Sequence, residues 1–438
     1  MDEMTLKAKE INQQAGILIK SGKIEKAKEK LEEAIDLDPM LRESYEHYGE
    51  LYMHTGQYQK AKDYFKKALM INKTGELYFA YGNACFMNDE LEDGIKNYNL
   101  AISEGFDSDE MMFFMGMAYE HMQDDRMALR YFTKAYLKNP ARPDYLVKKI
   151  ELLLKMGELE EAEKCIDKLI SSAPELFDGY HLKTNLLIHN NKVRDAVIFS
   201  KTASEKFPED VELLFDYARA LTLEKDFESA YKVIDRAKKM KYFEEEKRDF
   251  IYLEAQITAE KNNIPQAIQY CNECIELEEG NYFDEEVRYM LMNLYLEQKD
   301  YCNSFKIADE IVKNNHENIF YFAALYYRPF SQKKICNDDE TKKMYKDAIS
   351  IYRIKSLETP SSLDLYIYRA MCLKDLEEYD DALELTDFLL EVNDSIAEVY
   401  ILRAQIYKEK GDKVAEKNQM EKAYKIKPEL KTVYSGGE

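Results

Sequence analysis

An alanine recurs every 34 residues through the middle of this chain, at Ala128, Ala162, Ala196 and Ala230. A proline keeps the same step, at Pro140, Pro174 and Pro208. A period of this length indicates one supersecondary unit that is copied along the chain. Each copy can bury its apolar face only against its neighbours, so the period predicts a solenoid rather than a globular domain.

Numbering one unit from Asp109 shows what each position contributes. Small residues stand at position 8 (Gly116) and position 20 (Ala128), where they let two helices approach closely. Phe132 at position 24 is large and fills the space between those helices. Pro140 at position 32 ends the second helix, because proline cannot continue one. The unit therefore predicts a pair of helices.

This pattern resembles the tetratricopeptide repeat. Other units carry the same residues, among them Ala15, Gly22, Ala27, Leu31, Ala34 and Pro39 in the first, Tyr45, Tyr48, Gly49, Tyr52, Gly56, Ala61, Phe65 and Ala68 in the second, and Tyr400, Ala404, Tyr407, Gly411, Ala423 and Pro428 in the last. The resemblance covers about twelve units over residues 8–430. It implies an all-α fold, a right-handed α-solenoid superhelix of stacked antiparallel helix pairs.

The regularity of the period divides the chain. We predict a regular array of about seven repeats over residues 8–244, a less regular array of about five over residues 245–430, and a short tail over residues 431–438. The short tail predicts no further helix to cap the last repeat.

The period slips at three places in the second array. Three extra residues stand at Glu245–Lys247 and three more at Tyr282–Asp284. About ten extra residues lie around Pro329–Asp338, after a helix predicted over Ile319–Arg328. We predict that this last insertion, near 329–338, is a mobile loop, since it contains a proline and few apolar anchors.

Composition limits the partners. The formal net charge is −22, so phosphate backbones and acidic membrane surfaces are poor partners, and nucleic acid and membrane are excluded. The first residues carry no apolar signal segment, and seven scattered cysteines suit a reducing compartment, so we expect a cytoplasmic protein. The natural partner is a protein or an extended peptide that carries basic segments.

An acidic residue recurs at position 2 of the units, at Glu43, Glu76, Glu110, Asp144, Asp178, Glu212, Asp249, Glu286, Asp364 and Glu398. Position 2 falls in the first turn of the first helix, where a carboxylate complements the helix dipole. The same residues could also form an acidic edge that attracts basic segments. The first interpretation is the simpler one, and one arrangement can serve both.

Positions 5, 9 and 12 share one face of the first helix, which we call the groove stripe. The resemblance implies that this stripe faces a concave groove, where aromatic rings and amides suit an extended peptide. The candidate peptide-binding residues are Phe79, Asn83, Phe86, Phe113, Met117, Val147, His181, Asn185, Phe215, Arg219, Tyr252, Gln256, Tyr289 and Asn293. Alternatively, position 5 merely widens the core between repeats.

Cysteine and histidine patterns favour structural roles. Cys271 and Cys274 form a lone CxxC, but they fall at core positions 24 and 27 among glutamates. A zinc site would need a second ligand pair. His54, His121 and His189 each stand near the end of the first helix of a unit, where a histidine is favourably placed. They are about two repeats apart, which is too far for them to share a metal ion.

Signatures of catalysis are absent from the sequence. It has no glycine-rich phosphate loop, no GxSxG and no HExxH, so we expect no enzyme activity, no catalytic residues, no metal and no cofactor. Some tetratricopeptide proteins hold an EEVD carboxylate with basic residues, the first of them at position 5. The first six units place no Lys or Arg there.

The function predicted is a non-enzymatic cytosolic scaffold or adaptor that binds proteins through a concave groove. Two alternatives stay open at this point. The chain could be the regulatory subunit of an enzyme complex, or a structural protein that forms homo-oligomers through its uncapped end.

Overall fold

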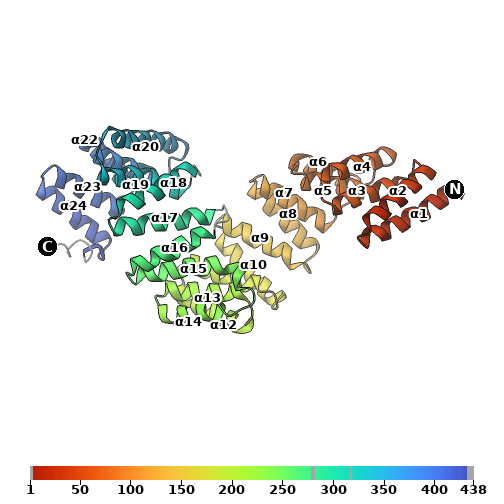
Figure 1. Ribbon diagram of the computed structural model, residues 1–438, viewed down its shortest axis with the longest axis horizontal. Helices are drawn as coiled ribbons and strands as arrows, with labels where there is room; N and C mark the ends of the chain where they lie inside the picture. Colours follow the sequence, from red (N-terminus) through yellow and green to blue (C-terminus); the bar gives the residue numbers. More distant parts are fainter. Residues whose placement is uncertain (1–2, 278–281, 315–317, 432–438) are drawn as a thin grey trace. The chain divides into compact units, whose positions relative to one another are not determined.

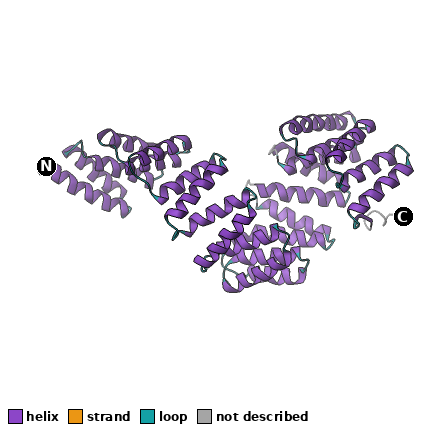
Figure 2. Cartoon of the chain, turned by 180° about the vertical axis from the view of Figure 1, so that it is seen from behind, coloured by secondary structure: helices purple, strands orange, loops and turns teal. Residues whose placement is uncertain are grey.

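The computed structural model describes residues 3–277, 282–314 and 318–431. Within these residues every regular element is a helix, and successive helices lie against one another in pairs (Figures 1 and 2). The described part contains 24 helices, a number that fits the predicted twelve pairs. The predicted all-α fold of stacked helix pairs is confirmed.

The helices are short and evenly sized in most of the chain. Their bounds are α1 Glu3–Lys20, α2 Ile24–Leu37, α3 Arg42–His54, α4 Tyr58–Ile71, α5 Gly75–Met87, α6 Leu91–Ser103, α7 Asp109–His121, α8 Asp125–Lys138, α9 Pro143–Lys155, α10 Leu159–Ser172, α11 Asp178–His189, α12 Val193–Lys206, α13 Val211–Leu223, α14 Phe227–Ala237, α15 Phe243–Glu260, α16 Ile264–Glu276, α17 Tyr282–Glu297, α18 Tyr301–Asn314, α19 Ile319–Ile335, α20 Asp339–Glu358, α21 Leu363–Asp375, α22 Tyr379–Val392, α23 Ala397–Glu409 and α24 Lys413–Ile426.

The chain divides into two compact units, Met1–Ala220 and Leu221–Glu438. This division reflects compactness and does not test how regular the repeats are. The boundary between the regular and the less regular array, at residue 244, therefore stays a prediction. None of the helices in the described ranges combines the length and the apolar character needed to cross a membrane.

Small residues bring the two helices of a pair together, as predicted. All four alanines at position 20 are fully buried. A Cβ added to Gly116 would lie 2.6 Å from the ring of Phe132, which is itself fully buried. A Cβ added to Gly82 would lie equally close to the ring of Tyr98. The ring at position 24 therefore rests on the bare backbone at position 8.

The core of the first unit continues from one repeat into the next. A single cluster of buried side chains runs through α6, α7, α8, α9, α10 and α11 and includes Tyr98, Met115, Tyr145, Ile150 and Ile166. Each repeat thus buries its apolar face against its neighbours, as a solenoid requires.

The turn inside a helix pair has a feature that the sequence analysis did not identify. Its residue at position 15 has a positive φ, between 57° and 79°, at Gly22, Gly56, Asp89, Gln123, Gly157, Asn191, Lys225, Asn262, Lys299, Glu377 and Gly411. This left-handed residue lets the next N–H bond back to the helix; Glu158 donates to the Leu153 carbonyl at 2.9 Å. Glycine suits the position best, yet most of these turns carry another residue.

Backbone strain at this position predicts a stability difference. An added Cβ at Gly157 would meet nothing within 4 Å, so Gly157→Ala should lose about 1–2 kcal/mol through the left-handed backbone alone. Gln123→Gly should gain up to ~1 kcal/mol, whereas the control Gln123→Ala keeps a Cβ and should gain nothing. Urea denaturation measures all three. Equal stability of Gly157→Ala and the native chain would refute this account of the turn.

The predicted mobile loop at 329–338 is wrong. Helix α19 continues through Pro329 to Ile335, and α20 begins at Asp339. Pro329 is buried, and the ring of Phe330 packs on Tyr326 with centroids 5.7 Å apart. The carboxylate of Asp338 accepts from the Thr341 N–H at 2.9 Å and caps α20. The extra residues therefore lengthen two helices instead of forming a loop.

The smaller insertions are absorbed in the same way. Glu245–Lys247 lie in the early turns of α15, and Asp284 lies in the first turn of α17. Longer first helices keep the pair geometry intact while shifting the sequence period.

Candidate functional site

The aromatic residues at position 5 lie between one repeat and the next. The ring of Phe113 is half-buried and packs on Tyr145 of the following pair, with centroids 4.9 Å apart. Phe79 stacks on Phe106 at 5.2 Å, and Tyr289 packs on Phe320 at 5.3 Å. These rings bind neighbouring repeats together and keep only an edge at the surface.

The other candidates on the stripe are also half-buried, apart from Tyr252, which is buried. The Tyr252 hydroxyl donates to Glu286, the position-2 carboxylate of the next repeat, at 3.0 Å. Asn83 accepts a hydrogen bond from the Tyr98 hydroxyl at 2.8 Å. The half-buried remainder are Phe86, Met117, Val147, Phe215, Gln256 and Asn293. Their role in binding stays a prediction.

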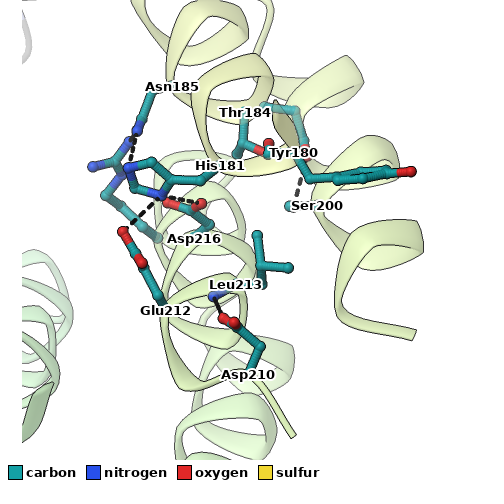
Figure 3. Close-up of polar contacts among 11 residues, drawn as sticks. Tyr180, His181, Thr184, Asn185, Ser200, Asp210, Glu212, Leu213 and Asp216 are labelled. Atoms are coloured by element: carbon teal, nitrogen blue, oxygen red, sulfur yellow. Dashed lines mark hydrogen bonds and ion pairs between the residues drawn. The ribbon is translucent and has the colours of Figure 1, made fainter. Parts of the chain in front are cut away.

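Three of the candidates form one polar network in the first unit (Figure 3). His181 Nδ1 lies 2.8 Å from Asp216 Oδ2 and 3.3 Å from Glu212 Oε1, while its Nε2 lies 2.7 Å from Asn185 Nδ2. Arg219 in turn donates to the Asn185 carbonyl oxygen. The network links α11 to α13 across the repeat boundary.

The carboxylates beside His181 favour its protonated form, whereas the Asn185 NH₂ group beside Nε2 can donate only to a neutral ring, so protonation requires that amide to turn. Burial lowers the pKa of His181, but the hydrogen bond to Asp216 and the charges of Asp216 and Glu212 outweigh it, so the pKa is raised. Burial raises the pKa of the Glu212 carboxyl, and the charge of His181 partly offsets that rise. Asp216 is fully buried, so its negative charge needs the partner that His181 supplies.

This arrangement predicts a pH-dependent contribution of His181 to stability. Because the pKa of His181 is raised in the folded state, its contribution to stability is fully present below the ordinary histidine pKa near 6.5. That contribution is lost as the pH rises through the folded-state pKa. His181→Gln should therefore lose about 1–3 kcal/mol at pH 6 and clearly less at pH 9. Denaturant titrations at both pH values measure the loss. A loss that is constant with pH would contradict a charged His181.

Packing of the position-5 rings predicts what truncation does. Phe113→Ala should cost about 2–3 kcal/mol of unfolding free energy, somewhat less than a fully buried ring. Leu137→Ala removes a side chain that is 71% exposed and serves as the control, with little change expected. Thermal melts followed by circular dichroism measure both. If Phe113→Ala melts like the native chain, the ring is a free groove residue rather than a core residue.

An open hollow lies at stripe positions within the second unit. Its volume is about 610 Å³. The lining comes from α19, α21, α23 and the residue before α23, and consists of Tyr327, Leu363, Asp364, Ile367, Tyr368, Met371, Ile396, Glu398, Ile401, Leu402 and Gln405. Asp364 and Glu398 are position-2 carboxylates, and Ile367, Met371, Ile401 and Gln405 occupy positions 5 and 9. The volume lies in the range typical of ligand pockets, roughly 300–1,000 Å³.

The chemistry of the hollow is apolar with a few polar groups. Burial raises the pKa of Tyr327 to about 12, so its hydroxyl stays protonated and can donate a hydrogen bond. Glu398 pairs with Lys427, and that hydrogen bond keeps the pKa of the carboxyl below its usual value. No lysine or arginine is among the lining residues described.

The sequence carried a signal for this hollow. Ile367, Ile401 and Gln405 occupy stripe positions, but the predicted peptide-binding residues end at Asn293. Position 5 is aliphatic in the last two pairs. An isoleucine is smaller than a phenylalanine, and the hollow lies where these two isoleucines stand.

The remaining candidate sites have structural roles. Cys271 and Cys274 are buried in one core cluster, as predicted, and burial raises the pKa of both thiols to about 12. All seven cysteines lie in the described part of the chain and are free thiols. His54, His121 and His189 lie in the last turns of their helices. Among the described residues no three or more His, Cys, Asp or Glu are placed to hold a metal ion together.

Comparisons with known proteins agree with the repeat pattern. Models of the tetratricopeptide repeat match residues 42–74 and, in a second form, residues 11–39, 151–176 and 397–430. A search of the curated proteins found no sequence that matches this chain.

Several solved structures are similar in fold. The pilF protein of Pseudomonas aeruginosa is 17% identical, over 48% of this chain and 97% of its own, with a TM-score of 0.41. YrrB, described as a TPR protein with an unusual peptide-binding site, is 22% identical over 42% of this chain and 98% of its own, with a TM-score of 0.36. The Cut9–Hcn1 structure of the APC/C is 12% identical over 98% of this chain and 94% of its own, with a TM-score of 0.44. Similarity at this level says nothing about ligands or partners.

Proposed function

This chain is a tetratricopeptide-repeat protein, and from that premise we propose that it is a non-enzymatic scaffold that binds other proteins along the groove stripe. Stacked helix pairs present a long surface for holding other polypeptides. A cytoplasmic location and the absence of catalysis belong to the same proposal.

The hollow between α19, α21 and α23 is the observation that carries this proposal. In the earlier repeats, rings such as Phe79 and Phe113 fill the corresponding positions by packing on their neighbours. In the last repeats the same positions surround open space lined by apolar side chains. Concave apolar surface with a few convergent polar groups is typical of a binding site.

The proposal is tested by affinity capture with the full-length tagged chain. A double variant, Ile367→Glu with Ile401→Glu, places two charges in the hollow. The control Ile198→Glu makes the same change at an isoleucine that is 67% exposed on α12. We expect the native chain and the control to recover the same proteins in stoichiometric amounts, and the double variant to lose them.

Two results would overturn the proposal. Either no protein is recovered above background, or the double variant retains every partner although circular dichroism shows all three chains equally helical. Identification of the recovered protein also separates the open alternatives. A catalytic partner indicates a regulatory subunit, and recovery of this chain alone indicates self-assembly.

A further inference from the structure

We propose that the hollow between α19, α21 and α23 receives a polypeptide segment in which large apolar side chains are followed by Lys or Arg. This inference rests on the proposed function and names the chemistry of the partner. It is carried by the lining of the hollow, by the unused NH₂ group of Gln405 and by the sign of the charge at the rim.

The lining of the hollow selects apolar side chains. Ile367 and Met371 contribute from α21 and Ile401 from α23, with the ring of Tyr368 beside them. Filling this space with leucine, methionine or phenylalanine removes apolar surface from water on both partners, at roughly 25 cal/mol per Å². A volume of about 610 Å³ exceeds what one side chain fills, so a segment with two apolar residues suits it better than an isolated one.

Polar groups at the hollow can bind the backbone of such a segment. The amide oxygen of Gln405 accepts weakly from Lys374 at 3.5 Å, and within the described residues its NH₂ group has no acceptor. Gln405 is exposed on α23. Its amide can therefore donate to a backbone carbonyl of an extended segment, which apolar side chains alone could not orient.

The charge at the rim selects the flanking residues. Asp364 is exposed in the first turn of α21, and among the described residues it makes no ion pair. Glu398 lies on the other side, in the first turn of α23, and Lys427 neutralises it only in part because this pair is itself about half exposed. One carboxylate is thus unpaired and a second is partly screened, and a lysine or arginine next to the apolar residues would pair with them.

An acidic segment would meet the opposite conditions. The described lining contains two carboxylates and no lysine or arginine, so a glutamate or aspartate in the partner would find only like charge. The formal net charge of −22 adds long-range repulsion of the same sign. The hollow therefore discriminates by charge as well as by apolar contact.

The test is fluorescence anisotropy of the purified full-length chain with three short labelled peptides. The first has leucine and phenylalanine flanked by lysine and arginine; the second keeps the apolar residues between glutamates; the third keeps the basic residues and replaces the apolar ones with serine. We expect the first peptide to bind at least about tenfold more tightly than either of the others, and its affinity to fall with salt.

Variants locate the binding. Asp364→Asn should weaken binding of the first peptide by roughly two- to fivefold and make that binding less dependent on salt, because it removes an exposed carboxylate that would pair with the peptide. Since Asp364 is exposed, the change leaves the fold intact. Ile401→Glu should weaken it by about tenfold or more, and Ile198→Glu should leave it unchanged. Sedimentation of the purified chain alone tests whether a second copy of this chain occupies the hollow. Self-association that Ile401→Glu abolishes would overturn the inference.

Equal binding of the basic and acidic peptides, or unchanged binding by Asp364→Asn and Ile401→Glu together, would also overturn it. Failure here differs from failure of the proposed function. If affinity capture recovers a partner that the hollow variants lose while the peptides show no charge preference, the scaffold proposal stands and the assigned partner chemistry is wrong.

Discussion

Asp284→Ala is expected to lower the free energy of unfolding of the second unit by about 3–5 kcal/mol. Asp284 is 3% exposed and pairs with Arg248, which is 8% exposed and also donates from Nε to the Cys274 carbonyl at 3.1 Å. Removing the carboxylate takes away one charge of a buried ion pair, and the remaining guanidinium loses that hydrogen bond in the core. Urea denaturation of the full chain, followed by circular dichroism, measures the loss.

The control for this prediction is Asp235→Ala, which removes an exposed carboxylate from α14 and should change stability by less than about 0.5 kcal/mol. A second comparison replaces both partners, Arg248→Met with Asp284→Leu. This pair of changes should recover much of the loss, because neither charge of this ion pair then remains in the core. A single variant as stable as the control would show that the ion pair has no structural role.

Asp375→Ala is expected to cost about 2–4 kcal/mol, because several buried groups share this one carboxylate. The hydroxyls of Tyr326 and Tyr345 donate to it at 3.0 and 3.1 Å, and Lys374 lies 3.1 Å from it. The carboxylate is 7% exposed, so the hydroxyls would find little water in its place. Asp375→Asn keeps one acceptor oxygen and should lose less.

Asp347→Ala is the matched control, since it removes an exposed carboxylate from the neighbouring helix α20. Thermal and urea denaturation of the three variants should rank them as Asp375→Ala, Asp375→Asn and Asp347→Ala, from least to most stable. An Asp375→Ala chain that matches the control would contradict the role given to this carboxylate in joining α19, α20 and α21.

The regular part of the fold could be predicted because its determinants are local. Gly116 and Phe132 lie only 16 residues apart, and they meet inside one helix pair. Gly49 with Phe65 and Gly82 with Tyr98 repeat this pair at the same spacing, so one register predicts several contacts. Helix ends, small positions and core cysteines follow from the same register.

The irregular repeats could not be predicted because their extra residues act at long range. Asp284 was counted as an insertion, and it is the buried partner of Arg248, 36 residues earlier. Lys333, within the supposed loop, donates to the Asp375 carbonyl at 2.6 Å. Proline and charge in a segment favour a loop in sequence terms, but these tertiary contacts stabilise helix there instead.

The register of the groove stripe could be taken from the sequence, whereas the binding role of its residues stays a prediction. The stripe register brings His181, Asn185 and Arg219 together, and it also leads to Ile401 and Gln405 in the hollow. Whether a stripe position is filled or open depends on the reach of its side chain toward the next repeat. The gap that a side chain must bridge to the next repeat depends on how the helices pack. The repeat pattern of the sequence does not predict it.

The most direct measurement of partner binding at the hollow is site-specific photo-crosslinking. A photoreactive amino acid replaces Met371 inside the hollow in one chain and Ile198 on α12 in another, and each chain is irradiated with a partner recovered by affinity capture. We expect a covalent adduct from position 371 that Ile401→Glu suppresses, and none from position 198. Equal crosslinking from both positions, or an adduct from position 198 alone, would contradict binding at the hollow.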